Sequence, residues 1–204
     1  MTNLTLRRAV PQDAPVVVPL MHDSSPGPLD VVFGHRAPAF LTRDFHRGHG
    51  IYGYTHQLLA VTPDDEIVAT LTAYPGSYYQ TMARHTLRSA ARALGPVRFP
   101  GALRRAAQVQ RLFIAPSPDA VFLANLCVAA QHRSRGHGSM MLRHAIRTAG
   151  EQGLRRVQFD VSWHNARAQQ LYERLGFTVT AERPDNSGRG IDGFRRMELT
   201  IENQ

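Results

Sequence analysis

The sequence contains no lysine, a single cysteine and a single tryptophan, and its acidic side chains are outnumbered by basic ones. All 24 basic residues are therefore arginine, and with 16 acidic residues they give a formal net charge of +8. Because Cys127 has no second cysteine to pair with, an internal disulfide framework is excluded, which favours a reducing compartment. The excess of positive charge indicates an anionic partner, such as nucleic acid, an acidic surface or a phosphorylated small molecule.

Long hydrophobic runs are also missing. The longest, residues 120–130, is interrupted by Asn125 and falls short of the roughly 18 residues that a membrane span needs. Residues 1–13 carry no apolar stretch after their charges, so we expect no secretory signal. With 43% hydrophobic and 20% charged residues, the 204-residue chain predicts a globular protein of the cytoplasm, with no membrane partner.

Hydrophobic periodicity predicts strands that alternate with helices in the second half of the chain, which is typical of an α/β layer structure. We expect strands at residues 5–9, 56–61, 66–74, 121–128, 156–161, 177–181 and 194–201. We expect helices after Pro11, weakly over 29–47, at 77–94 with Ser77 as cap, at 102–113, after the loop 129–136, and at 165–175. Residues 24–30 and 184–193 are predicted to be loops. The apolar strand at 121–128 is expected to be buried on both faces.

The most informative segment is residues 126–142, in which a buried strand leads into a loop and then directly into a helix. The loop carries Arg133, Arg135, Gly136 and Gly138. The first N–H groups of a helix lack intrahelical partners and carry partial positive charge, so this arrangement suits an anion. Its spacing is not that of the six-position dinucleotide fingerprint, and it is not a Walker loop, because the chain has no lysine. A turn with solvated arginines is the alternative interpretation.

Two motifs carry a family resemblance. Residues 133–138 match the R/Q-x-x-G-x-G/A motif of the GNAT superfamily of N-acetyltransferases, and residues 165–177 resemble its N-x-x-A-x-x-L-Y-x-x-x-G-F block. The resemblance is good over about 120–181 and loose over the N-terminal third, and Ala130 replaces a frequent proline. It implies a GNAT-like mixed central sheet flanked by helices, in one domain over residues 1–204. Residues 77–119 look like a helical insertion into that domain.

The resemblance implies that acetyl-CoA binds, as cosubstrate and without a metal, where two neighbouring parallel strands separate. Strand residues Leu126, Cys127 and Val128 would offer backbone groups to the pantetheine arm and the thioester. The loop and helix start would hold the pyrophosphate, through residues Arg133, Ser134, Arg135, Gly136, His137, Gly138 and Ser139. Asn165 would hydrogen-bond the pantetheine amides, although its position also suits a helix N-cap.

Tyr172 lies on the apolar face of the helix predicted at 165–175. The resemblance implies that it is the general acid that protonates the CoA thiolate, as well as a residue close to the cofactor. A phenol of ordinary pKa near 10 can do this when it is positioned and partly desolvated. The alternative is a core aromatic side chain whose hydroxyl is satisfied by a neighbour.

A general base is harder to name. Asn125, on the strand before the loop, cannot act as a base. His132, His137, His164 and Asp160 are candidates by residue type. Proton loss through water, or an acceptor amine that is already neutral, stays open. Cys127 can form a covalent acetyl intermediate in principle, but a cysteine in an apolar strand is usually a small buried hydrophobe.

The insertion is basic, since residues 67–118 contain no acidic residue and seven arginines. Arg84, Arg88 and Arg92 recur every four positions and would form one helical stripe. The stripe would contact an acidic acceptor, nucleic acid or a partner surface, or would simply be solvated. Three tyrosines at the edge of the insertion would line an acceptor pocket or pack in the core; they are Tyr74, Tyr78 and Tyr79.

Three functions remain open at this point. The first is transfer of an acetyl group from acetyl-CoA to a primary amine by direct attack on the thioester in a ternary complex. The second is an acyl-CoA-binding sensor without catalysis, suggested by the missing base. The third is a basic nucleic-acid-binding module, which no recognition-helix, zinc or RNA-binding signature supports. A homodimer is possible for any of them.

Overall fold

The computed structural model describes residues 4–185, 191 and 193–201. Its centre is a mixed sheet of seven strands in the order β1-β2-β3-β4-β5-β7-β6. The strands are β1 Thr5–Arg8, β2 Gln57–Val61, β3 Ile67–Pro75, β4 Ala120–Val128, β5 Arg156–Ser162, β6 Thr178–Arg183 and β7 Phe194–Thr200. The pairs are antiparallel except β4 with β5, which are parallel. The mixed sheet flanked by helices confirms the predicted fold class.

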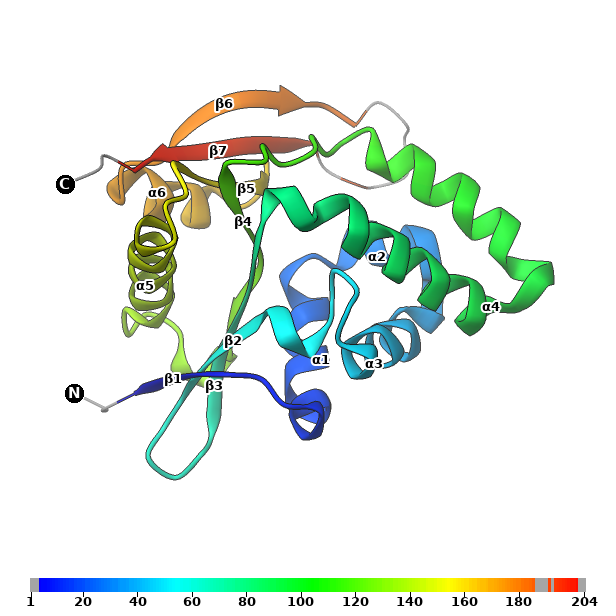
Figure 1. Cartoon of the computed structure of the whole chain (residues 1–204), viewed down its shortest axis with the longest axis horizontal. Helices are drawn as coiled ribbons and strands as arrows, with labels where there is room; N and C mark the ends of the chain where they lie inside the picture. Colours follow the sequence, from blue (N-terminus) through cyan, green and yellow to red (C-terminus); the bar gives the residue numbers. More distant parts are fainter. Residues whose placement is uncertain (1–3, 186–190, 192, 202–204) are drawn as a thin grey trace.

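Helices cover both faces of the sheet (Figure 1). They are α1 Ala14–Ser24, α2 Pro26–Phe33, α3 Ala37–Arg47, α4 Tyr79–Gln110, α5 His137–Glu151 and α6 Ala166–Arg174. On one face, α5 and α6 bury Met141, Leu142 and Tyr172 against the strands. On the other face, α1 and α3 bury a second cluster around Met21 and Phe40. The sheet is thus the middle layer of a three-layer structure.

The loop predicted at 24–30 was wrong, because α2 begins at Pro26. Pro26 and Pro28 occupy the first turn of that helix, where the missing N–H costs no intrahelical bond. The weak helical stretch predicted over 29–47 is two helices, α2 and α3, and α3 ends at Gly48 in the left-handed conformation. In the predicted loop 184–193, residues 186–190 and 192 lie outside the described residues.

The helical insertion is a hairpin of two helical halves between β3 and β4. Its chain runs as α4 across a break at Gly95, whose φ of 70° and ψ of 174° are not helical. The halves fold back alongside each other, so that the Gln110 amide donates a hydrogen bond to the Tyr79 hydroxyl at 3.0 Å (Figure 1). The predicted end of the first helix at residue 94 is confirmed, because the break follows at Gly95. The second half, predicted from 102, already begins after this break, because Pro96 suits a first helical position.

Two smaller predictions about this region were wrong. Ser77 caps no helix, because α4 begins after Tyr78, and Ser77 lies in the short turn Gly76–Tyr78. Strand β4 is not buried along its whole length, since its second half around Leu126 and Val128 is only partly covered. That half is not paired with β5 within the described residues, as set out below. Within the described residues, no helix is both long and apolar enough to cross a membrane.

Candidate active site

The two parallel strands separate in the middle of the sheet. Strand β4 pairs with β5 over residues 120–122, and no further β4–β5 pair follows among the residues that the structure describes. Strand β5 nevertheless stays paired with β7 as far as Ser162, and β4 stays paired with β3 as far as Val128. The second halves of β4 and β5 therefore diverge and leave an opening between them. This is the strand separation that the family resemblance implies.

Strand β4 is distorted at this opening. Asn125 has a φ of 50°, and the register with β3 shifts between Thr70 and Thr72, as in a β-bulge. The Asn125 amide nitrogen donates to the Thr72 hydroxyl at 2.9 Å, and the Ser24 hydroxyl donates to Asn125 Oδ1 at 3.2 Å. Thr72 in turn donates to the buried side chain of Gln57 at 3.0 Å. A chain of uncharged hydrogen bonds thus fixes Asn125 at the opening.

The glycine-bearing loop lies after β4 and ends at helix α5. Gly136 has a φ of 84° and precedes the first helical residue, His137. The Arg133 guanidinium folds back, and its Nε donates to the Val128 carbonyl at 2.9 Å. Arg167 of α6 donates to the Ser134 hydroxyl at 2.9 Å, which ties the loop to the next helix. Residues 133–136 are exposed, so the loop presents its polar groups to solvent.

Gly138 lies at the base of the same loop, in the first turn of α5. A side-chain carbon there would meet Leu171 at 3.7 Å and Val128 at 3.9 Å, which are ordinary contacts. The protein interior therefore does not require glycine at this position. The N–H groups of the first turn, at His137, Gly138 and Ser139, point out of the helix start, where a helix binds anions. The predicted anion geometry is present.

Asn165 is the N-cap of α6. Its side-chain oxygen accepts a hydrogen bond from the Ala168 N–H at 3.1 Å, so the capping interpretation is confirmed. The residue also lines the cavity described below, on the side of the β4–β5 opening. Its predicted contact with pantetheine stays a prediction, and the amide nitrogen is the group that can serve it.

Tyr172 is buried, with 9% of its surface exposed, and its ring contacts Phe159 edge-on at 4.3 Å between centroids. Burial raises the pKa of its phenol to about 12. The residue belongs to the apolar cluster under α5 and α6, as the core interpretation expected. It also lines the cavity at the β4–β5 opening. The position of Tyr172 is therefore compatible with both interpretations, a core aromatic side chain and a residue close to the cofactor.

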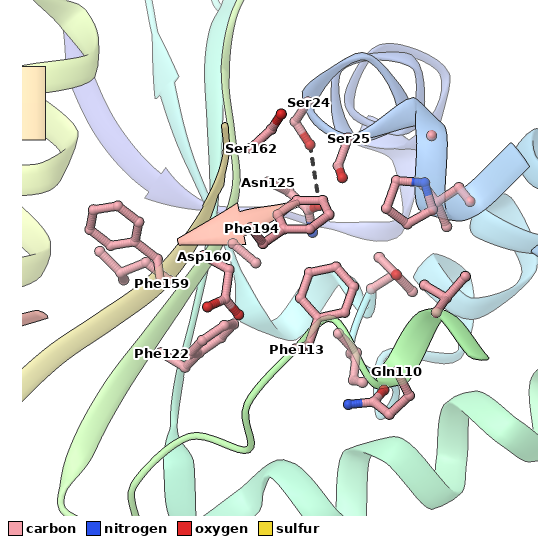
Figure 2. Close-up of a pocket in the computed structure, with 18 of the residues that line it drawn as sticks. Ser24, Ser25, Gln110, Phe113, Phe122, Asn125, Phe159, Asp160, Ser162 and Phe194 are labelled. Atoms are coloured by element: carbon pink, nitrogen blue, oxygen red, sulfur yellow. Dashed lines mark hydrogen bonds between the residues drawn. The ribbon is translucent and has the colours of Figure 1, made fainter. Parts of the chain in front are cut away.

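A cavity of about 700 Å³ continues from the opening to the helical hairpin α4 (Figure 2). Its walls come from α1, α2, α4, β4, β5 and the segment after α4. Of the three tyrosines at the edge of the insertion, Tyr74 and Tyr79 line it, whereas Tyr78 is 61% exposed on the surface. The size is that of a small-molecule site.

Of the four proposed bases, Asp160 alone lines this cavity. His132 pairs with Glu66 at 2.9 Å on the β2–β3 hairpin, away from the cavity. His137 lies beside His132, and partial burial lowers the pKa of its imidazole. His164 is exposed at the end of β5. The structure thus separates the histidines from the carboxylate.

Asp160 forms an ion pair with Arg196, its cross-strand neighbour on β7. The Arg196 Nε donates to Oδ1 at 2.7 Å and its Nη2 donates to Oδ2 at 3.0 Å, while the same Nη2 also donates to the Ile114 carbonyl. Burial raises the pKa of Asp160, although Arg196 opposes that shift. Sequence reasoning missed Arg196, because which strand lies beside β5 cannot be read from the sequence.

Cys127 is not among the described residues that line the cavity. It is buried in the cluster formed with α1 and α3, and burial raises the pKa of its thiol. A protonated, buried thiol is a poor nucleophile, so the interpretation as a small hydrophobe is supported. Arg84, Arg88 and Arg92 are exposed on α4 and do not line the cavity.

Both the sequence and the fold of this chain are similar to those of known proteins. The sequence model of the Acetyltransferase (GNAT) family matches residues 36–177. A solved acetyltransferase has a TM-score of 0.67 at 20% identity, covering 97% of this chain and 100% of its own. An N-acetyltransferase from Staphylococcus aureus Mu50 has a TM-score of 0.66 at 15% identity, covering 97% of this chain and 100% of its own. These two structures support the fold.

A curated relative matches a shorter segment. The chloroplastic GCN5-related N-acetyltransferase 6 of Arabidopsis thaliana is 40% identical over 58 residues, which are 28% of this chain and 20% of that protein. The match thus spans about a fifth of the relative's length. The fold of this chain is that of the solved acetyltransferases. The family match extends over most of the chain, and the protein belongs to the GNAT family of acetyltransferases, for which acetyl-CoA is the typical acetyl donor.

Proposed function

We propose that this protein transfers the acetyl group of acetyl-CoA to a primary amine, by direct attack of the amine on the thioester in a ternary complex. The observation that carries this proposal is the opening between β4 and β5, which leads into a cavity lined by Tyr172 and Asn165. The glycine-bearing loop lies at the end of the same strand, β4. A thioester in the opening would therefore face an amine in the cavity.

Acetyl-CoA would be bound by groups at the start of α5, on β4 and at Asn165. The pyrophosphate would accept hydrogen bonds from the N–H groups at the start of α5, with Arg133 and Arg135 adding positive charge. The backbone of residues 126–128 would hydrogen-bond the pantetheine arm, and Asn165 would add a side-chain amide. No metal takes part in the proposed reaction.

The proposed reaction requires two proton movements. The amine nitrogen attacks the thioester carbonyl carbon, and the C–S bond then breaks to release the CoA thiolate. Tyr172 donates its phenol proton to that thiolate and regains a proton from solvent. The attacking amine loses its proton to water, since both carboxylate oxygens of Asp160 are bonded to Arg196. The raised pKa keeps the phenol protonated at neutral pH, and because the phenol is a weaker acid than a thiol, its proton would pass to sulfur as the C–S bond breaks.

The loop proposal predicts a difference between two glycine substitutions in α5. Gly136 and Gly153 lie just outside opposite ends of the helix, both have positive φ, of 84° and 73°, and both have open space around them. Replacing either by alanine should cost about 1–2 kcal/mol of unfolding free energy. Gly136→Ala should also raise the Kd of acetyl-CoA about tenfold, measured by calorimetry, because the loop must shift. Gly153→Ala should leave that Kd unchanged, and equal Kd values for both variants would count against the loop.

Calorimetry with acetyl-CoA, followed by release of free CoA thiol with a panel of amines, tests the proposed function. We expect saturable binding at micromolar concentrations and amine-dependent thiol release. Binding without thiol release for any amine would indicate the sensor. Absence of binding, together with salt-dependent binding of DNA, would indicate the nucleic-acid module.

Three further predictions concern the whole protein. We propose that residues 1–204 form one domain that includes the insertion at 77–119. We also expect a cytoplasmic location, and a homodimer is possible. Light scattering measures the oligomeric state. The proposed reaction needs none of the three predictions to hold.

A further inference from the structure

The cavity has a polar end and an aromatic end (Figure 2). Near the β4–β5 opening, Ser24, Ser25, Asn125 and Ser162 present hydroxyl and amide groups. Farther from the opening, toward α4, the walls are aromatic and include Phe113 and Phe122, whereas Phe194 lies between the two ends, as the cross-strand neighbour of Ser162. The rings of Phe113 and Phe194 lie 4.7 Å apart between centroids, and those of Tyr74 and Phe122 lie 5.6 Å apart.

The cavity carries no unbalanced charge among the described residues. None of its described lining residues is arginine or histidine, although the chain has 24 arginines and 10 histidines. Asp160 is the carboxylate found among those lining residues, and Arg196 neutralises it through two hydrogen bonds. Arg196 also caps the ring of Phe122, at 5.2 Å from the centroid. An anionic group placed in this cavity would find no counter-ion.

The arginines of α4 do not change this balance. Arg84, Arg88 and Arg92 are exposed on the outer surface of the hairpin. Arg105 is bound elsewhere, since its guanidinium donates twice to the Val32 carbonyl, at 3.2 and 2.8 Å. The inner surface of the hairpin instead contributes uncharged side chains to the cavity, both apolar ones such as Ala83 and Val109 and polar ones such as Thr86 and Gln110. The hairpin thus presents positive charge outward and an uncharged surface inward.

We propose that the acceptor is a primary amine on an uncharged aromatic body, an arylalkylamine, and that amines carrying a carboxylate or phosphate are rejected. This inference rests on the proposed acetyl transfer and specifies its acceptor. The amine would lie at the polar end, where hydroxyl and amide oxygens accept hydrogen bonds from it. The aromatic body would lie among the phenylalanines. Burying an unpaired carboxylate there costs far more than burying a ring.

Matched pairs of amines test the charge preference directly. Phenethylamine and phenylalanine differ by one carboxylate, as do tryptamine and tryptophan, and spermidine adds a polar polycation. Thiol release is measured at saturating acetyl-CoA, with kcat/KM expressed per unprotonated amine. We expect kcat/KM for phenethylamine to exceed that for phenylalanine by about 100-fold or more. Comparable values for the two members of each pair, or the highest value for spermidine, would overturn the inference.

Two tryptophan variants test the location. Ala83→Trp fills the cavity from α4, whereas Ala107→Trp places the same side chain on the exposed surface of the same hairpin. Ala83→Trp should raise the KM for tryptamine about tenfold, the scale on which a pocket responds to added bulk, with the Kd of acetyl-CoA unchanged. Ala107→Trp should match the wild type. Equal KM values in both variants would place the acceptor elsewhere.

Failure of the inference is distinguishable from failure of the proposed function. If no amine in the panel releases thiol, acetyl transfer is wrong. Calorimetry with phenethylamine and phenylalanine alone then still reports on the cavity. Binding of phenethylamine but not phenylalanine, lost in Ala83→Trp, supports the aromatic amine site. Binding of neither, or of phenylalanine equally well, overturns it.

Discussion

Replacing Tyr172 by phenylalanine is expected to lower kcat about 100-fold, the lower range for loss of a general acid. The Kd of acetyl-CoA should change less than about twofold, because the proposed proton transfer takes place in the transition state and not in the bound ground state. The substitution removes one oxygen and keeps the ring against Phe159 and Phe177. The measurements are steady-state thiol release and calorimetry. An unchanged kcat would remove Tyr172 from the mechanism.

The exposed residue Tyr78 provides the matched control for this prediction. Tyr78→Phe should leave kcat and the Kd of acetyl-CoA unchanged.

The pH profile of wild-type kcat/KM gives a second check on Tyr172. Because burial raises the pKa of Tyr172 to about 12, its phenol stays protonated well above pH 8. Wild-type kcat/KM should therefore rise toward the pKa of the acceptor amine, with no falling limb between pH 7 and pH 10 from the phenol. A falling limb in that range that disappears in Tyr172→Phe would contradict the raised pKa.

The second large effect is on stability. Arg196→Met should lower the free energy of unfolding by about 3–5 kcal/mol at pH 7, because it leaves the buried carboxylate of Asp160 without its partner. The two side chains are 4% and 6% exposed, so water does not replace the lost contact. Urea unfolding followed by circular dichroism measures the loss. A change below about 1 kcal/mol, the value typical of surface pairs, would contradict it.

The sign of the pH dependence follows from the pKa of Asp160, which burial raises and Arg196 lowers. Without Arg196, the folded-state pKa rises further above the unfolded value. The folded state then binds the proton more tightly than the unfolded state, so the variant should lose stability as pH rises from about 4 to 8. The double variant Asp160→Asn with Arg196→Met should recover part of the loss. Arg147→Met, which breaks an exposed pair with Glu151, is the control and should cost less than about 1 kcal/mol.

The parts of the site that follow local rules could be predicted from sequence. The loop at 133–136, the helix that begins after it and the N-cap at Asn165 depend on short segments whose residue types determine their geometry. The separation of the two parallel strands came from the family resemblance rather than from periodicity. The pairing pattern confirms it, because the described β4–β5 pairs end at Phe122 and Gln158 while β5 stays paired with β7 as far as Ser162.

The remaining parts depend on contacts between distant segments. Arg196 reaches Asp160 because β7 lies beside β5, and Ser24 reaches Asn125 because α1 packs on β4. Neither neighbour can be derived from spacing along the chain. The helix α2 was missed for a different reason. Two prolines so close together are typical of a loop, whereas the first turn of a helix tolerates both.

The helical hairpin between β3 and β4 also bears on how this protein could change over evolution. The chain leaves the sheet at Pro75 and returns at Val121, and these two residues are paired neighbours. The hairpin is therefore a closed excursion, whose ends stay together whatever its own sequence or length. Its inner surface forms a wall of the cavity, while the glycine-bearing loop and Tyr172 lie outside it. Substitutions, or exchange of the whole segment, can alter that wall as a separate module and leave intact the half of the molecule that we propose binds acetyl-CoA.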